Sequence, residues 1–206
     1  MDTRDSKAHW ENIYRTKGEK EFSWFQEYPA VSLELIKSLQ LPSDIKILDV
    51  GGGDSRLVDS LLLMGYKNIS VLDISEKAIL IAKERMGSNA DKIDWIAGDI
   101  TEYKTKTSFD LWHDRAAFHF LTEQDQIEKY LAVARRQIKR GGYLVIGTFS
   151  EKGPNKCSGL FIKQYSDFSL STLFENGFRR INCKEEIHTT PSHGTQNFLF
   201  CSFQRI

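Results

Sequence analysis

The stretch that decides the fold is residues 46–75, KILDVGGGDSRLVDSLLLMGYKNISVLDIS. An apolar run, residues 47–50, leads directly into three consecutive glycines, and leucines at helical spacing follow them. A second apolar run begins at Ile69 and ends on Asp73. This order of elements is typical of a nucleoside-binding βαβ unit: a strand, a glycine turn, a helix, and a second strand that ends on an acid. The glycines let a ligand approach the backbone, and the acid can accept hydrogen bonds from both ribose hydroxyls.

Two other nucleotide sites do not fit this glycine loop. The dinucleotide fingerprint G-x-G-x-x-G requires a third glycine where this chain has Arg56. A phosphate-binding P-loop requires a Lys-Ser/Thr pair after the glycines, and none follows here. Asp49 stands two residues before Gly51, where its carboxylate would repel a pyrophosphate. The same carboxylate suits a cationic ligand that carries an ammonium and a sulfonium.

Three motifs, LDVGGG at 48–53, LDIS at 72–75 and AGDI at 97–100, resemble those of the class I S-adenosylmethionine-dependent methyltransferases. They cover the first half of the chain and imply S-adenosylmethionine as the cofactor. The resemblance implies that the acid at the end of the second strand holds the ribose, and that Asp99 accepts from the adenine amino group while Ile100 packs on the ring. The residues of these motifs that we expect at the cofactor are Asp49, Gly51, Gly52, Gly53, Asp73, Ile74, Asp99 and Ile100.

The expected fold is a single α/β domain with a Rossmann-like, seven-stranded, mostly parallel sheet and helices on both faces. Residues 180–189 and 196–203 alternate like two strands joined by TPSHG, which predicts a C-terminal antiparallel hairpin. We expect residues 1–42 to form an N-terminal arm and helix that act as a lid. Residues 43–150 would form the cofactor-binding half, and residues 151–206 the acceptor-side loop and the hairpin.

Composition excludes several other classes of protein. Twenty-eight basic and 28 acidic residues leave no net charge, so a large nucleic-acid surface is not expected. No apolar run has membrane-spanning length, and the first ten residues are too charged for a secretory signal. The cysteines, Cys157, Cys183 and Cys201, have no C-x-x-C spacing, which predicts neither disulfides nor a zinc site. We therefore expect a reduced cytoplasmic protein, a monomer or weak homodimer, without a metal.

The first 28 residues are rich in aromatic side chains, among them Trp10, Tyr14 and Trp24. One interpretation is ordinary helix packing, since Trp10, Ile13 and Tyr14 have helical spacing. The other is a lid that contacts the cofactor, and the two are compatible. The segment HWENIYRTKGEKEFSWFQEYP resembles the N-terminal arm of small methyltransferases, which folds across the cofactor.

The predicted fourth strand, FDLWHDRAAFHFLT at 109–122, ends in polar side chains at the edge where ligands of open α/β sheets bind. We expect Asp114 and Arg115 to contact the cofactor, and His119 or Asp114 to act as a base. Two plainer interpretations stay open: an ion pair between Asp114 and Arg115, and a core position for His119. The later loop carrying Cys157 is expected to line the acceptor pocket together with His119.

These observations predict methyl transfer from S-adenosylmethionine to a small-molecule acceptor, largely by positioning and desolvation. The first alternative is a protein-lysine methyltransferase of the elongation-factor type, whose glycine loop and arm this chain resembles. The chain lacks the D-K-G-T-L-D stretch of that group. A further alternative is a cofactor-binding subunit without catalytic activity.

Overall fold

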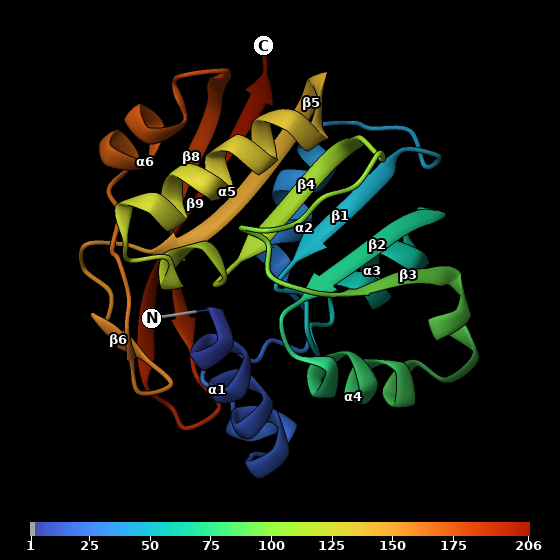
Figure 1. Ribbon diagram of the computed structural model, residues 1–206, viewed down its shortest axis with the longest axis vertical. Helices are drawn as coiled ribbons and strands as arrows, with labels where there is room; N and C mark the ends of the chain where they lie inside the picture. The colour runs from blue at the N-terminus through green and yellow to red at the C-terminus, as the bar shows by residue number, and fades with distance from the viewer. Residues whose placement is uncertain (1–2) are drawn as a thin grey trace.

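The computed structural model of the chain describes the backbone of residues 3–206 and side chains from residue 5 onward; Met1 and Asp2 of the predicted arm lie outside the described residues. Helices surround a seven-stranded sheet (Figure 1). The strands of the sheet are β1 (Lys46–Val50), β2 (Asn68–Asp73), β3 (Ile93–Ala97), β4 (Phe109–Arg115), β5 (Ile138–Phe149), β8 (Phe178–Thr189) and β9 (Thr195–Arg205). A separate two-stranded pair is formed by β6 (Lys156–Cys157) and β7 (Leu160–Phe161).

The helices follow the order that the sequence predicts. The α-helices are α1 (Thr3–Thr16), α2 (Ala30–Ser38), α3 (Leu57–Leu63), α4 (Glu76–Met86), α5 (Gln124–Gln137) and α6 (Asp167–Phe174). Short 3-10 helices are η1 (Glu19–Glu21), η2 (Gly87–Lys92) and η3 (Phe118–Phe120). Ser75 caps α4, since its side chain accepts a hydrogen bond from the backbone of Ala78 at 3.1 Å.

The strand order β3-β2-β1-β4-β5-β9-β8 confirms the predicted Rossmann-like sheet. The central strand β1 pairs in parallel with both β2 and β4, and β5 continues the parallel set. Strand β9 runs antiparallel between β5 and β8, which confirms the C-terminal hairpin. All the parallel strands therefore end at one edge, where the loops after β1, β2, β3 and β4 meet.

Alternating side chains of the strands form a core on each face of the sheet. On one face Leu48 and Trp112 belong to a cluster with residues of α5 and α6. On the other face Ile47 and Leu111 belong to a cluster with residues of α2 and α3. Figure 1 shows α5 lying across the front of the sheet and α2 and α3 behind it. Both faces of the parallel strands are therefore covered, as their continuous apolar runs require.

The cysteine prediction is wrong on one point, because Cys183 and Cys201 form a disulfide. They are direct partners across β8 and β9, with their Cα atoms 4.1 Å apart. The strand register brings them together, and eighteen residues separate them in the chain, so no short cysteine motif signals the pair. Cys157 is the free cysteine among the described residues.

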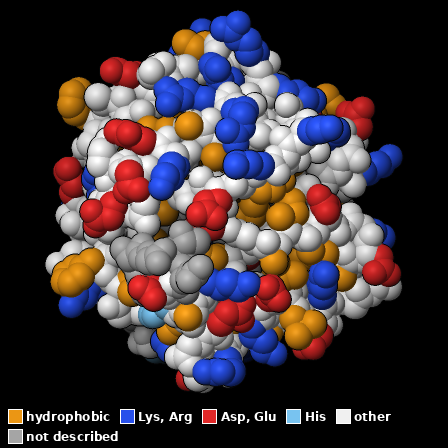
Figure 2. Space-filling view, in the orientation of Figure 1, with side chains coloured by type: hydrophobic (Ala, Val, Ile, Leu, Met, Phe, Trp, Pro, Cys, Tyr) orange, Lys and Arg blue, Asp and Glu red, His pale blue; other side chains and the backbone are white. Residues whose placement is uncertain are grey.

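The surface mixes charges of both signs. Figure 2 shows basic side chains predominating over the upper part of one face, around α5 and the neighbouring strand ends, and acidic ones interspersed below. Hydrophobic side chains also reach the surface near the middle of this face (Figure 2). None of the helices in residues 3–206 is long and apolar enough to cross a membrane.

Candidate active site

A cavity of about 340 Å³ lies at the carboxyl edge of the parallel strands. One side is formed by the ends of β1 and β2 and the segment after β3, and another by the segment after β4. The arm and the β6–β7 pair supply the remaining wall with Trp10, Tyr14, Trp24, Leu160 and Phe161. A concave, largely apolar site with a few polar groups is the usual form of a small-molecule site.

The glycine loop, residues 51–53, turns sharply at the end of β1. Gly51 and Gly53 have positive φ values of 63° and 42°, which disfavour other residues. A Cβ on Gly51 would lie 2.5 Å from the Cβ of Ala117, and one on Gly53 would lie 2.8 Å from the Tyr14 hydroxyl. Gly51 lines the cavity. Gly52 and Gly53 shape the loop from behind, against Asp49 and Tyr14 respectively.

Asp49 lies beneath the glycine loop and is 2% exposed. Its Oδ1 is 2.7 Å from Nδ1 of His113, and Nε2 of that histidine is 2.9 Å from the Ser32 hydroxyl. Its Oδ2 is shielded from solvent and has no hydrogen-bond partner in the described chain. The same oxygen would be 2.7 Å from a Cβ on Gly52. One carboxylate oxygen is thus fixed by the protein, and the other is buried under the loop without a partner. Asp49 is not among the residues that line the cavity.

Asp73 ends β2 and lines the cavity beside Ile74. Its Oδ1 accepts a hydrogen bond from the backbone of Ser75 at 2.8 Å. Burial raises the pKa of this carboxyl to about 7, and the negative charge of Asp49 adds to the increase. Among the described side chains, no cation forms an ion pair with this carboxyl group, which agrees with its raised pKa.

Asp99 and Ile100 follow β3 and line the cavity next to Gly98; their contact with the adenine stays a prediction. The backbone and hydroxyl of Thr101 donate to Asp99 Oδ1 at 2.7 and 2.8 Å. This local turn fixes the carboxylate at the cavity wall. Ile100 is 9% exposed, so it presents an apolar surface at the same end.

The arm packs over the cavity through aromatic contacts. Trp10 meets Phe120 edge-on at 4.9 Å and Trp24 at 5.8 Å between ring centroids. Trp24 also stacks on Phe22 at 4.8 Å, and Tyr14 packs against both rings. All three predicted arm residues line the cavity, so packing on the domain and contact with the cavity occur together.

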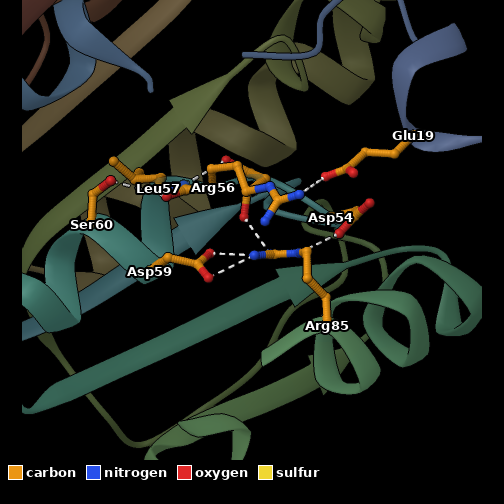
Figure 3. Close-up of polar contacts among 8 residues, drawn as sticks. Glu19, Asp54, Arg56, Leu57, Asp59, Ser60 and Arg85 are labelled. Atoms are coloured by element: carbon orange, nitrogen blue, oxygen red, sulfur yellow. Dashed lines mark hydrogen bonds and ion pairs between the residues drawn. The ribbon is translucent and has the colours of Figure 1, made fainter. Parts of the chain in front are cut away.

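A polar network that the sequence analysis missed holds the glycine loop to α3 and α4 (Figure 3). Arg85 of α4 donates from Nε to Asp54 at 2.9 Å, from Nη1 to Asp59 at 2.6 Å and from Nη2 to the Ser55 carbonyl at 3.0 Å. Arg56 forms a further ion pair with Glu19, which lies between the arm helix and α2. The acids Asp54 and Asp59 after the glycines were the available signal in the sequence. Their partner, Arg85, lies 31 and 26 residues further along the chain, so the sequence did not indicate the pairing.

The predicted roles of His119 are not supported by its position. The residue is fully buried in η3 and outside the cavity wall. Its Nδ1 accepts a 3.2 Å hydrogen bond from the backbone of Phe149, whose ring packs on the imidazole at 4.6 Å. Burial and the nearby charge of Arg115 lower the pKa of His119 to about 3. A neutral core histidine, the plainer interpretation, describes it.

Asp114 likewise does not reach the cavity. It is fully buried, and its Oδ1 accepts hydrogen bonds from the backbones of Ala117 and Phe118, both at 3.1 Å. Its Oδ2 accepts from the Tyr130 hydroxyl at 2.8 Å. Both oxygens are used in fixing the turn after β4, so the predicted catalytic and cofactor contacts of Asp114 are corrected to a structural role. The alternative ion pair with Arg115 is also absent from the described residues.

Arg115 and Cys157 do line the cavity; their contacts with cofactor and acceptor stay predictions. Arg115 donates from Nη1 to the Trp24 carbonyl of the arm at 2.9 Å. The Cys157 sulfur lies 4.0 Å from the Ser23 hydroxyl, and burial raises the pKa of the thiol. Phe120, Leu121 and Leu160 complete this side, which is mostly apolar.

Known structures share this fold. A TehB-like S-adenosylmethionine-dependent methyltransferase from Corynebacterium glutamicum superposes with a TM-score of 0.64 at 20% identity, covering 99% of this chain and 98% of that one. The N-methyltransferase NodS of Bradyrhizobium japonicum gives 0.71 at 16% identity, covering 100% and 99%. Residues 47–142 match the family described as a methyltransferase domain. Residues 47–142 therefore form a methyltransferase domain, and the chain has the fold of the class I S-adenosylmethionine-dependent methyltransferases.

The curated relatives that this chain matches are longer proteins. The eEF1A lysine and N-terminal methyltransferase of Bos taurus is 30% identical over 164 residues, which are 76% of this chain and 23% of that protein. The ribosomal protein L11 methyltransferase of Staphylococcus haemolyticus is 30% identical over 131 residues, covering 61% and 39%. The chain thus spans about a quarter of the length of the eEF1A methyltransferase.

S-adenosylmethionine is the cofactor of the methyltransferase class, and the residues of the site fit it. A buried carboxylate oxygen of Asp49 has no protein partner, and Asp73 presents a carboxylate in the cavity wall. These acids suit a ligand with an ammonium, a sulfonium and a ribose diol. Within the described part of the chain, no group of three or more His, Cys, Asp or Glu side chains could hold a metal ion.

Proposed function

We propose that the protein transfers the methyl group of S-adenosylmethionine to a small-molecule acceptor. The observation that carries this proposal is the cavity of about 340 Å³, which the aromatic arm covers on one side. Trp10 of the arm packs edge-on against Phe120 of the domain, so the wall on that side is closed. A covered, largely apolar cavity suits a small acceptor better than a peptide chain, which needs an open groove.

In this proposal the acidic residues hold the cofactor. Asp73 accepts from the ribose hydroxyls, and Asp99 accepts from the adenine amino group, with Ile74 and Ile100 against the ring. The free Oδ2 of Asp49 attracts the ammonium beneath the glycine loop. Support comes from the positions of Asp73, Asp99 and both isoleucines in the cavity wall.

The bound cofactor supplies a methyl group made electrophilic by its sulfonium. The contribution of the chain is to orient the acceptor behind that methyl group and to exclude water. Trp10, Tyr14 and Trp24 of the arm cover the cavity and perform the second task. The two predicted bases, His119 and Asp114, lie outside the cavity wall, so this proposal assigns no proton transfer to either.

The proposal is tested with radiolabelled S-adenosylmethionine and panels of thiols, carboxylates, phenols and amines. Time-dependent label in a small product that Asp73→Asn fails to form is the expected result. Binding of S-adenosylhomocysteine without transfer to any small molecule or protein would instead indicate a cofactor-binding subunit.

A second candidate function is methylation of protein lysine or N-terminal amines. It is favoured by the 30% identity to the Bos taurus eEF1A lysine and N-terminal methyltransferase. The same labelled assay with purified elongation factor and with whole-lysate proteins distinguishes the two. Label in a protein band, with none in small molecules, would replace the small-molecule proposal by this one.

A further inference from the structure

Arg115 ends β4 with hydrogen-bond donors that the protein leaves unused. Its Nη1 donates to the Trp24 carbonyl at 2.9 Å. Its Nε and Nη2 are shielded from solvent and have no hydrogen-bond partner in the described chain. The residue lines the cavity, so these donors belong to a side chain in its wall.

A guanidinium in this position is short of a counter-ion. None of the carboxylates that the structure describes lies within ion-pair distance of Arg115 (Asp49, Asp114 and Glu186 included). Burial lowers the pKa of Arg115 to about 10, and the charges of Glu186, Cys157 and Asp49 offset only part of that decrease. A buried guanidinium stays charged and is costly unless an anion pairs with it. Arg115 therefore lines the cavity with a side chain that has two unpaired donors, Nε and Nη2, in the fork geometry that suits a carboxylate.

We propose that Arg115 binds a carboxylate of the acceptor, so that the substrates of this methyltransferase are small carboxylic acids. This inference rests on the proposed small-molecule function and names its substrate class. A lysine ammonium brought to the same place would meet the positive charge of Arg115, which disfavours the amine acceptors of the second candidate function.

The surroundings of Arg115 favour the acceptor over the cofactor as the source of the carboxylate. The guanidinium lies over the ring of Phe198 in β9 at 4.9 Å and bonds to the arm at Trp24. Glu186 of β8 and Cys157 of β6 act on it more strongly than Asp49 of the glycine loop does. Arg115 therefore contacts the hairpin and the arm, and neither Asp73 nor Asp99 is among the charges that act on it.

The test measures ligand binding in the presence of saturating S-adenosylhomocysteine. A panel of aromatic and aliphatic carboxylates is compared with the matching amides by thermal shift, and the best pairs are measured by calorimetry. The wild-type protein should bind the acids at least ~10-fold more tightly than the amides, because a paired guanidinium favours a charged ligand. Arg115→Met should abolish that preference, Arg115→Lys should keep part of it, and both should bind S-adenosylhomocysteine within ~3-fold of the wild type.

His188→Gln is the matched control for the hydrogen bond by which Arg115 holds the arm at the Trp24 carbonyl. Nε2 of His188 lies 2.8 Å from the Ser23 carbonyl, so it anchors the same arm segment, but His188 does not line the cavity. This variant should keep the preference for acids. If it loses the preference as Arg115→Met does, Arg115 acts only by holding the arm and the proposal fails.

The remaining outcomes are distinct. Equal binding of acids and amides, or no acid bound at all, overturns the carboxylate site while leaving the cofactor site intact. A loss of S-adenosylhomocysteine affinity in Arg115→Met of ~10-fold or more, with the preference for acids unchanged, shows that the cofactor's own carboxylate occupies Arg115. Failure of the wild type to bind S-adenosylhomocysteine would overturn the proposed function itself.

Discussion

The Glu11 carboxylate in α1 accepts a 2.6 Å hydrogen bond from the backbone amide of Glu76, the first residue of α4. A second bond, from the amide of Lys77, measures 3.3 Å. A carboxylate at a helix N-terminus satisfies amides that have no partner within the helix and interacts favourably with the helix dipole. Because α4 begins three residues after Asp73, this contact fixes the arm next to the predicted ribose site.

Glu11→Ala should therefore loosen the arm and weaken cofactor binding. Contacts of this kind contribute about 1 kcal/mol, which corresponds to a ~5-fold loss of affinity for S-adenosylhomocysteine by calorimetry. Lys7→Ala is the matched control, because the pair between Lys7 and Glu76 is exposed and should contribute little. Equal affinities of Glu11→Ala and the wild type would show that the arm is held without this contact.

Among the residues that support the glycine loop, we expect Arg85 of α4 to be the most sensitive to substitution. Its side chain is 13% exposed and binds Asp54, Asp59 and the Ser55 carbonyl (Figure 3). Arg85→Lys cannot reproduce the fork, so we expect a loss of about 2 kcal/mol or more in the free energy of unfolding. Affinity for S-adenosylhomocysteine should also fall ~10-fold, because the glycine loop loses its support.

The exposed pair between Lys139 and Asp110 provides the control for Arg85. Lys139→Met should change the free energy of unfolding by less than about 1 kcal/mol. Urea denaturation of both variants and calorimetry with S-adenosylhomocysteine make the comparison. A stable Arg85→Lys with normal affinity would mean that the loop is held by its glycines and by Asp49 alone.

The sequence could predict that the residues expected at the cofactor lie together, because each of them is at the end of a strand of the sheet. Gly51, Asp73 and Asp99 each end a strand of a parallel sheet, and all such ends meet at one edge. The same logic predicted the order of elements and the C-terminal hairpin. Regular periodicity and the topology of βαβ units carry this information without long-range contacts.

The acceptor half could not be predicted as well, because burial there depends on distant segments. Asp114 and Arg115 are the last two residues of β4, yet Asp114 is buried in the core and Arg115 lines the cavity. His119, in η3 after the strand, is also buried in the core. Ala116, in the turn after β4, has a φ of 63°, a conformation that could not be predicted from an alanine. The disulfide between Cys183 and Cys201 depends on strand register in the same way.

Asp73→Asn should raise the stability of the protein without ligand and weaken its binding of S-adenosylhomocysteine. The pKa of Asp73 is raised from 3.8 to about 7 by burial, so the folded state keeps a proton that the unfolded state loses. This group's contribution to stability is therefore lost as the pH rises from about 4 to about 7. The asparagine variant has no such loss, so without ligand it should melt at a higher temperature than the wild type at pH 8.

The same variant should bind S-adenosylhomocysteine at least ~10-fold more weakly, because hydrogen bonds to a charged acceptor contribute about 1.5–3 kcal/mol each. Wild-type affinity should increase between pH 6 and pH 8 as Asp73 ionises, and the variant should show no such increase. Calorimetry across this range is the measurement. Unchanged affinity at pH 8 would remove Asp73 from the cofactor site.

His119→Asn should lower stability but not turnover, since the imidazole is a buried structural group. Its pKa is lowered from 6.5 to about 3, so only the unfolded state takes up a proton between these values. The stability of the wild type should therefore be lost as the pH falls from 6.5 toward 3, and the variant should lack this part of the acid sensitivity. At pH 8 the lost ring packing should lower the free energy of unfolding by about 2 kcal/mol.

His193→Asn, in an exposed turn with a φ of 63°, is the control and should change neither stability nor turnover. Turnover per folded molecule that falls ~100-fold in His119→Asn, with normal cofactor affinity, would restore the histidine as the base.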